Sequence, residues 1–273
     1  MTRRRFPVGK TLLYVFMSLW ALTTIYPFIW VILNSFKPRG LIRSDTFSLP
    51  IGDKFTLENY VTAFKRVDIG TAYVNSIVIS GAVTVVVMVL AGLAAYAMVR
   101  YSFRLRGFLH SMIIASMMFP VFSTIIPVFR MESSWGIVNT GSIWLTRLSV
   151  VLPQIAGNLS FAIIVLMGFI RSLPVDLEEA AYLEGYNVYQ IFFRIIMPLA
   201  KPSFATVGIF TFLWSYNDLF LQMFFLRSKK FFTITRLLNE ISSQAGTNYG
   251  LMVAAVVMVV IPVLVVYIFL QNY

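Results

Sequence analysis

Residues 176 to 198 read Asp-Leu-Glu-Glu-Ala-Ala-Tyr-Leu-Glu-Gly-Tyr-Asn-Val-Tyr-Gln-Ile-Phe-Phe-Arg-Ile-Ile-Met-Pro. Four of the chain's 11 acidic residues fall within nine positions of this stretch, with no basic residue among them: Asp176, Glu178, Glu179 and Glu184. The rest of the chain is basic and apolar. The stretch therefore predicts a short acidic surface that meets a basic partner.

The same stretch predicts two short helices joined at a glycine. Asp176 suits the N-cap of a first helix over 177–184, and Glu179 would complete a capping box with it. Gly185 suits the left-handed residue that ends this helix. A second helix is predicted from apolar residues at helical spacing, whose shared face should pack on the protein itself before Pro198 ends the helix: Val188, Ile191, Phe192, Ile195 and Ile196. The alternative is that the acidic residues are only helix caps and solvated charges.

The composition predicts a membrane protein. The 273 residues are 59% hydrophobic and 12% charged, against about 45–50% and about 25% for soluble domains. The net charge of +11 is typical of a chain that is attracted to anionic lipid. Nucleic-acid binding is disfavoured because the basic residues are spread among the apolar segments. The chain has no cysteine and one histidine, His110, which excludes disulfides, thiolate chemistry and histidine-cluster metal sites.

Six segments are apolar for about 20 residues, enough to cross a bilayer as helices. They are 11–34, 74–98, 107–129, 148–170, 203–226 and 250–270. The predicted fold is therefore an all-α membrane protein with six transmembrane helices. Pro120 and Pro127 make the third helix the strongest candidate for a bend. Asp218 is the clearest charge inside a span, about 22 Å along it. Such a carboxylate either lines a translocation path or makes a hydrogen bond between helices.

The distribution of basic residues predicts that both termini are cytoplasmic. The inner and outer segments have similar totals of Lys and Arg, so density near the span ends is the better guide. The bases of the first ten residues and of the turn between the second and third spans are Arg3, Arg4, Arg5, Lys10, Arg100, Arg104 and Arg106. The apolar stretch after Lys10 is longer than a signal-peptide core, which predicts a retained span.

Two outer segments follow from this topology. The segment 35–73 contains Leu57, Tyr60, Val61 and Phe64 at helical spacing. With Thr56 as a candidate N-cap, they predict a short helix on the membrane surface. The segment 227–249 is polar in composition and is expected to be either a flexible contact for a soluble partner or a solvated connector.

The stretch Glu179-Ala180-Ala181, with Gly185, Ile195 and Pro198 at the spacings found here, resembles the EAA signature of ABC importer permeases. The usual form is Glu-Ala-Ala, three residues, Gly, nine residues, Ile, one residue, Leu-Pro. This chain departs from it at Met197, where Leu is usual, and that change is apolar and conservative. The match has no gaps and lies in the expected inner loop.

Further stretches resemble the sugar permeases of the maltose/multiple-sugar type along nearly the whole chain. They are Tyr26-Pro27-Phe28, Asn34-Ser35-Phe36-Lys37, Leu57-Glu58-Asn59-Tyr60, Trp214-Ser215-Tyr216-Asn217-Asp218-Leu219-Phe220 and Thr247-Asn248-Tyr249-Gly250. In the fourth stretch Tyr216 replaces a usual Trp and Asp218 replaces a usual Glu. Members usually continue into a short tail after a sequence like Gln271-Asn272-Tyr273. The sequence stops at Tyr273, so any inner-face contact made by such a tail is either absent or was cut away with it.

The resemblance implies one transmembrane permease domain over 1–273, with a coupling segment at 176–198. It implies a binding-protein-dependent importer of carbohydrate, of oligosaccharide size by family analogy, in the plasma (inner) membrane of a prokaryote. The implied partners are a second related permease subunit, two ATP-binding ABC ATPase subunits and an extracytoplasmic sugar-binding protein. The implied ATPase-coupling residues are Glu179, Ala180, Ala181, Gly185, Ile195 and Pro198, and candidates for the translocation path are Trp214, Asn217 and Asp218.

No nucleotide-binding loop of the form G-x-x-x-x-G-K-[ST] occurs in the chain. The subunit is therefore expected to be no enzyme, with no catalytic residue, metal or cofactor of its own, and ATP and Mg would bind the partner ATPase. The alternative function is a self-contained secondary transporter or channel, which should show an inverted repeat and ion-coupling charges at mid-membrane; neither is evident. A membrane-embedded enzyme is disfavoured by the single histidine and the lack of cysteine.

Overall fold

The computed structural model describes residues 8–66, 68–245 and 248–270, and every regular element in these ranges is a helix. The predicted all-α class is confirmed. The chain forms two compact units: Met1–Val67 with Glu240–Ile261, and Asp68–Asn239 with Pro262–Tyr273. The predictions on Arg3, Arg4 and Arg5, on Thr247 and on the stretch Gln271-Asn272-Tyr273 fall outside the described residues.

The first unit contains α1 (Val8–Ser35), α2 (Arg39–Ser44), the short 3-10 helix η1 (Gly52–Lys54) and α3 (Glu58–Arg66). The predicted short helix over the outer segment is confirmed as α3. The Thr56 hydroxyl accepts a hydrogen bond from the Glu58 amide at 3.1 Å, so it satisfies one of the free amides at the helix start. Leu57, Val61 and Phe64 are exposed. Their position on a membrane surface stays a prediction.

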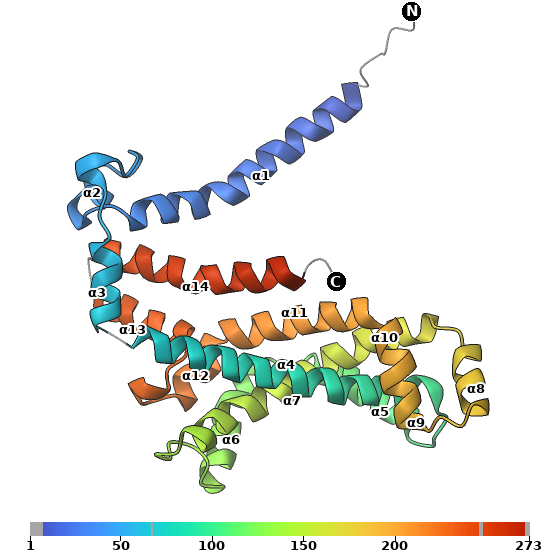
Figure 1. The fold of residues 1–273 in the computed structure, drawn as a ribbon. Helices are drawn as coiled ribbons and strands as arrows, with labels where there is room; N and C mark the ends of the chain where they lie inside the picture. Colours follow the sequence, from blue (N-terminus) through green and yellow to red (C-terminus); the bar gives the residue numbers. More distant parts are fainter. Residues whose placement is uncertain (1–7, 67, 246–247, 271–273) are drawn as a thin grey trace, which may run out of the picture. The chain divides into compact units, whose positions relative to one another are not determined.

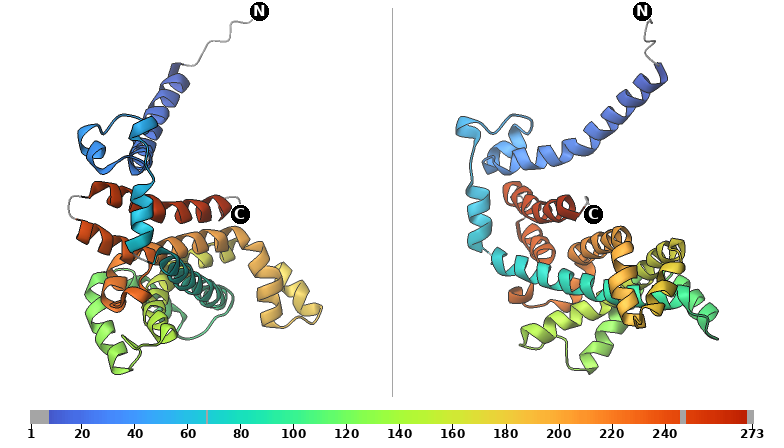
Figure 2. Two further views of the ribbon diagram at one scale, coloured as in Figure 1. Left: turned by 60° about the vertical axis from the view of Figure 1, so that its left-hand side comes forward. Right: turned by 45° about the vertical axis from the view of Figure 1, so that its right-hand side comes forward.

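The second unit is built on α4 (Ile69–Arg100), α7 (Ile143–Ser172) and α11 (Lys201–Asn217), which pack side by side (Figure 1; Figure 2). Its shorter helices are α5 (Arg106–Ser116), α6 (Val121–Ser134), α8 (Asp176–Leu183), α9 (Val188–Ile191), α10 (Met197–Leu199), α12 (Leu219–Phe225) and η3 (Lys229–Phe231). Two more helices, α13 (Ile234–Ala245) and α14 (Tyr249–Leu270), have residues in both units.

Small and branched side chains let α4 approach its neighbours closely. Fully buried residues recur every fourth position along it: Val83, Val87, Ala91 and Ala95. A Cβ atom on Gly92 would lie 2.8 Å from the Phe204 ring and 2.9 Å from the Phe192 ring. A larger residue there would displace these two rings, and the glycine lets α4 pack closely, as small residues do between helices in lipid.

Length and composition allow α1, α4 and α7 to cross a membrane as single helices. The pair α5 and α6 is bent by 104°, and the α9–α10 run meets α11 at 82°, giving up to five spans if each bent pair is one span. The predicted bend in the third segment is confirmed, because α5 ends at Ser116 and Pro120 precedes α6. The predicted segment 203–226 is two helices that meet at Asp218. The count of six spans stays a prediction.

The prediction of a solvated connector over 227–249 is wrong for most of that range, which holds α13. Ile234, Leu237 and Ile241 recur at helical spacing, and each is less than a tenth exposed. The Ser- and Gly-rich composition of the neighbouring residues concealed this apolar face.

Candidate functional site

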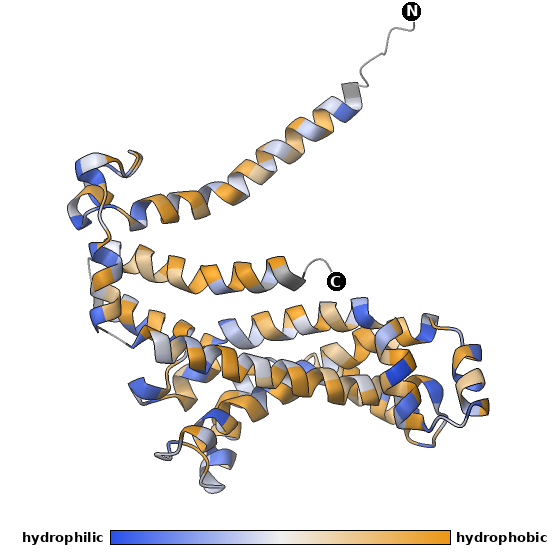
Figure 3. Ribbon diagram, in the orientation of Figure 1, coloured by the Kyte–Doolittle hydropathy of each residue, from blue (hydrophilic) through white to orange (hydrophobic). Residues whose placement is uncertain are grey.

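The acidic stretch forms α8 and α9 at one end of the second unit, where Figure 3 shows hydrophilic positions on otherwise hydrophobic helices. The predicted capping box at Asp176 and Glu179 is wrong. The N-cap position is Val175, which makes no side-chain cap, and Asp176 is the first helical residue. Asp176, Glu178 and Glu179 all lie in the first turn, where carboxylates stabilise a helix by facing the positive end of its dipole.

The end of α8 is as predicted. Gly185 has a φ of +84°, which residues with a Cβ atom rarely adopt. The Tyr186 amide donates to the Ala181 carbonyl and the Gly185 amide donates to the Tyr182 carbonyl, both at 3.0 Å. These two bonds make a complete Schellman motif, so Gly185 fixes the direction in which the chain leaves α8.

A capping box does occur, at the start of α9. The Gln190 amide donates to Asn187 Oδ1 at 2.9 Å, and the Asn187 amide donates to Gln190 Oε1 at 2.8 Å. The Asn-x-x-Gln spacing was the sequence signal for it. The prediction that Pro198 ends the second helix is wrong by one residue, because α10 runs to Leu199 and the turn into α11 occurs at Ala200.

Proline acts earlier than predicted, by widening the helix before it. Residues Phe192–Ile196 are π-helical, and the Met197 amide donates to the Phe192 carbonyl. Pro198 has no amide hydrogen and its ring crowds the carbonyl four residues earlier, which a wider turn relieves. Ile191, Phe192 and Ile196 are fully buried, as predicted, whereas Ile195 is only partly buried and Val188 is exposed.

The outer face of α8 offers both charge and apolar surface. Glu179 and Ala180 are exposed, and the Leu183 side chain is 91% exposed. Ala181 is buried against the protein, so of the two alanines only Ala180 is on the free face. Tyr182 is exposed, and its hydroxyl lies 3.0 Å from the Tyr101 hydroxyl. That hydrogen bond raises the pKa of Tyr101.

Glu178 has a different role from its neighbour Glu179, and no local sequence pattern indicates this difference. Its carboxylate accepts from Arg100 Nε at 2.5 Å and from the Tyr96 hydroxyl at 2.7 Å. The Arg100 and Glu178 side chains are 10% and 5% exposed, and Arg100 Nη2 also donates to the Leu173 carbonyl at 2.9 Å. Losing one partner of such a buried pair costs about 3–5 kcal/mol, because the other charge is left uncompensated. This pair attaches α8 to the end of α4.

Asp218, a predicted path residue, lies in the break between α11 and α12. Its Oδ1 accepts from the Leu221 amide at 3.1 Å, capping α12, and its Oδ2 accepts from Gln154 Nε2 of α7 at 3.1 Å. Gln154 Oε1 in turn accepts from the Ser215 hydroxyl at 2.6 Å. Gln222 donates to the Ser215 carbonyl and accepts a hydrogen bond from Thr233. Asp218 thus belongs to a polar network that joins α7, α11 and α12.

The other two predicted path residues are exposed on α11. Trp214 packs edge-to-face on Phe161 of α7, with ring centroids 4.8 Å apart. Asn217 donates to the Leu213 carbonyl of its own helix at 2.9 Å. The structure brings Trp214, Asn217 and Asp218 together on the last turns of α11, apart from the coupling residues of α8.

Three family-like stretches meet in the first unit, where they serve the fold. Asn59 Nδ2 donates to the carbonyls of Ser35 and Lys37 at 2.9 and 2.8 Å, and the Tyr60 and Ser35 hydroxyls lie 2.6 Å apart. A Cβ atom on Gly250 would collide with the Asn59 side-chain amide. Asn59 therefore hydrogen-bonds to the end of α1 and lies against Gly250 at the start of α14.

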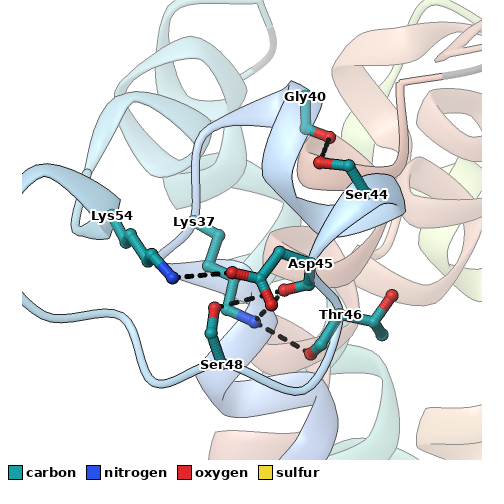
Figure 4. Close-up of polar contacts among 7 residues, drawn as sticks. All are labelled: Lys37, Gly40, Ser44, Asp45, Thr46, Ser48 and Lys54. Atoms are coloured by element: carbon teal, nitrogen blue, oxygen red, sulfur yellow. Dashed lines mark hydrogen bonds and ion pairs between the residues drawn. The ribbon is translucent and has the colours of Figure 1, made fainter.

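Lys37 is fully buried in the same unit (Figure 4). Its Nζ donates to the carbonyls of Asp45 and Thr46 at 3.0 and 2.8 Å, and burial lowers its pKa. The Asp45 carboxylate pairs with Lys54 at 2.6 Å. These bonds close the loop after α1, so Lys37 has a structural role.

A shallow pocket of about 460 Å³ lies in the second unit between the α6–α7 loop and the segment after α12. Its lining residues are Asn139, Thr140, Gly141, Arg227, Ser228, Lys230 and Phe231. Two cations and several hydrogen-bonding side chains suit it to an anionic or polar partner group.

Comparison with known proteins identifies the family. Residues 87–273 match the model of the binding-protein-dependent transport system inner membrane component. The diacetylchitobiose uptake system permease protein NgcG of Streptomyces coelicolor is 34% identical over 261 residues, covering 95% of this chain and 84% of that protein. The melibiose/raffinose/stachyose import permease protein MelC of Bacillus subtilis is 29% identical, covering 90% and 87%. The arabinooligosaccharides transport system permease protein AraQ of Halalkalibacterium halodurans is 29% identical, covering 100% and 96%.

Solved structures share the fold. A chain of a bacterial ABC transporter involved in the import of the acidic polysaccharide alginate matches with a TM-score of 0.82 at 24% identity, covering 100% of this chain and 99% of that one. A chain of the bacterial alginate transporter in complex with an alginate pentasaccharide-bound periplasmic protein matches with a TM-score of 0.70 at 17% identity, covering 99% and 96%. The family match over more than half of the chain and the relative at 34% identity confirm the resemblance found in the sequence. The chain is a multi-pass membrane protein and belongs to the inner membrane components of binding-protein-dependent transport systems.

Proposed function

We propose that this chain is a transmembrane subunit of an ATP-driven importer of carbohydrate, with oligosaccharides as the substrate class. The support is that its relatives are named for diacetylchitobiose, for melibiose, raffinose and stachyose, and for arabinooligosaccharides. It acts with a second related permease subunit, two ABC ATPase subunits and an extracytoplasmic sugar-binding protein. ATP and Mg bind the ATPase subunits, and this chain carries no catalytic residue, metal or cofactor.

The observation that carries the proposal is α8 with its Gly185 turn. The helix is short, is attached on one side through Ala181 and Glu178, and is free on the side of Glu179, Ala180 and Leu183. An exposed carboxylate beside an exposed leucine suits a partner cleft with a basic rim and an apolar floor. Glu179 pairs with a basic group of the ATPase, and Leu183 enters the cleft.

Closure of the ATPase pair on ATP then pushes α8 as a lever. Behind it, the Gly185 turn, the capped α9 and the buried π-helical segment lead directly into α11. Movement of α8 tilts α7 and α11 and switches the cavity between inward and outward access. Ile195 and Pro198 belong to this connection, and Trp214, Asn217 and Asp218 border the path that opens.

In the proposed orientation both termini and α8 are cytoplasmic, and the pocket that contains Arg227 and Lys230 faces outward. The pocket is then the contact for the binding protein, because its two cations and its hydrogen-bonding side chains suit an acidic or polar group on a soluble partner.

The test is to purify the chain with its genomic partners and reconstitute the complex in vesicles. We expect native mass spectrometry to show two different permease subunits and two ATPase subunits, and uptake of labelled oligosaccharide to need both ATP and the binding protein. Uptake by this chain alone, driven by an ion gradient, would overturn the proposal in favour of a secondary transporter.

A further inference from the structure

The two ends of α4 are held by two buried polar clusters. At one end Tyr96 and Arg100 hold Glu178 of α8, with bonds of 2.7 and 2.5 Å. At the other end Asn75 and Ser76, each 1% exposed, hold η3 and the segment that follows it. Tyr96 and Ser76 are 20 residues apart in one helix, about 30 Å at 1.5 Å per residue, which is the thickness of the hydrocarbon core.

The outer cluster is centred on Asn75. Its Nδ2 donates to the carbonyls of Lys230 and Phe232 at 3.3 and 3.0 Å, and its Oδ1 accepts from Arg147 Nη2 of α7 at 2.8 Å. The Ser76 hydroxyl accepts from the Ile234 amide at 2.8 Å. Lys230 also lines the pocket described above. A change at Lys230 in that pocket therefore reaches α4 through the hydrogen bonds that the Asn75 side chain donates to backbone carbonyls.

Between the clusters α4 is suited to transmit a displacement. It is one helix of 32 residues with no proline inside it, whereas α6, α7 and α14 contain proline and α11 and α12 are separated by the break at Asp218. Packed cores switch between discrete arrangements and do not deform continuously. A helix with bonded ends and a middle that is fully buried at Val83 and Val87 moves as a rigid body.

We infer that α4 is a transmembrane strut between the outer pocket and α8, and that the Glu178–Arg100 ion pair is its attachment to the coupling helix. This inference rests on the proposed function. It extends that function by assigning a separate task to each of two adjacent glutamates. Glu179 faces the ATPase, whereas Glu178 is a positioning residue that carries the state of the outer face to α8.

The first test measures ATPase activity of the reconstituted complex with and without the binding protein. Asn75→Leu removes the hydrogen bonds of the outer cluster, and Glu178→Gln removes the ion pair with Arg100 in the inner cluster. We expect each to lower the stimulation by the binding protein at least tenfold, with basal ATPase activity and co-purification of the ATPase retained. The double variant should be no worse than either single variant, because both cut one connection. The exposed Asp53→Asn in η1 is the control and should change nothing.

Stimulation at the wild-type level in Glu178→Gln, or independent losses that multiply in the double variant, would overturn the strut. A wild-type complex that the binding protein does not stimulate would instead refute the proposed function. The two failures are therefore distinguishable.

The second test leaves Asn75, Arg100 and Glu178 unchanged. Its result therefore does not depend on whether Asn75→Leu or Glu178→Gln folds. The exposed tyrosines Tyr101 and Tyr182, whose hydroxyls touch, are replaced by cysteines in this cysteine-free chain and joined by a short bis-maleimide. If α4 stays attached to α8 throughout the cycle, we expect uptake by the cross-linked variant to be within twofold of uptake by the same variant treated with a monofunctional maleimide. Loss of uptake with the cross-linker alone would show that α8 detaches from α4 in each cycle, which contradicts the inference.

Discussion

Single residues in this chain divide into those that shape the backbone and those that present chemistry, even where they are neighbours in sequence. Glu178 is buried in an ion pair and Glu179 is exposed. Gly185 and Gly250 are needed for different reasons. Gly185 adopts a positive φ, whereas at Gly250 the Asn59 side chain occupies the space that a Cβ atom would take.

At Gly185, replacement by valine forces a β-branched residue into the left-handed region, at a cost of about 1–2 kcal/mol. We expect Gly185→Val to insert in the membrane normally and to reduce uptake about tenfold or more, since the turn that joins α8 to α9 is lost. Asn adopts this conformation more readily than other residues with a Cβ atom. Gly185→Asn should therefore keep most of the uptake. Wild-type uptake by the Gly185→Val variant would show that the left-handed turn is not needed for transport.

At Gly250, an added methyl group meets the Asn59 side-chain amide. Gly250→Ala should therefore lower the stability of the purified protein by about 1–3 kcal/mol, the usual cost of overpacking, measured as a fall in the thermal unfolding temperature. Gly40→Ala is the matched control, because nothing lies within 4 Å of its added Cβ. It should be neutral or stabilising in α2, where alanine is the better helix former.

At the scale of elements, the sequence predicted the class and position of most helices. Apolar length alone placed α1, α4, α7 and α14, and proline placed the bend between α5 and α6. It missed what depends on tertiary contact. The ion pair between Arg100 and Glu178 joins residues 78 positions apart, and the break at Asp218 is stabilised by Gln154 of another helix. No local pattern encodes either of them.

The α11–α12 break depends on the Asp218 carboxylate as a cap. Asp218→Ala should lower stability by about 0.5–2 kcal/mol through the lost cap, and the bond to Gln154 is lost with it. Asp218→Asn keeps an acceptor for the Leu221 amide and should cost less. If Asp218 acts only in structure, uptake per folded complex will be unchanged in the asparagine variant. A change in substrate preference with unchanged thermal stability would instead show that the carboxylate lines the path.

The exposed face of α8 is expected to lose its contact with the ATPase when the charge of Glu179 is reversed. Glu179→Lys places like charges together across the proposed ATPase contact, where loss of a paired charge costs about 2–5 kcal/mol. We expect co-purification of the ATPase and uptake to fall at least about tenfold, while the subunit stays inserted. Asp53→Lys changes the net charge by the same amount far from α8 in sequence and serves as the control. Normal uptake in Glu179→Lys would leave α8 as a capped connector.

At the scale of the whole molecule, the density of basic residues near the ends of the first two spans predicts that both termini and α8 are cytoplasmic. The chain contains no cysteine, so single cysteines can report on each side. A cysteine at the exposed Arg104, between α4 and α5, should be protected from a membrane-impermeant maleimide in intact cells and should react after permeabilisation. A cysteine at the exposed Ser142, before α7, should react in intact cells. The reverse pattern would place α8 outside and refute ATPase docking.

The ion pair at the end of α4 has a consequence for how the protein is made. Ribosomes synthesise α4 before α8, so Arg100 is without Glu178 while the second span enters the membrane. During that interval Arg100 is a full positive charge next to Arg104 and Arg106, and such charges retain a loop on the cytoplasmic side. Only when Glu178 has been added does the pair of Arg100 and Glu178 become neutral and buried. In the proposed orientation, Arg100 serves first as an orientation signal during biogenesis and later as the proposed attachment of α4 to α8.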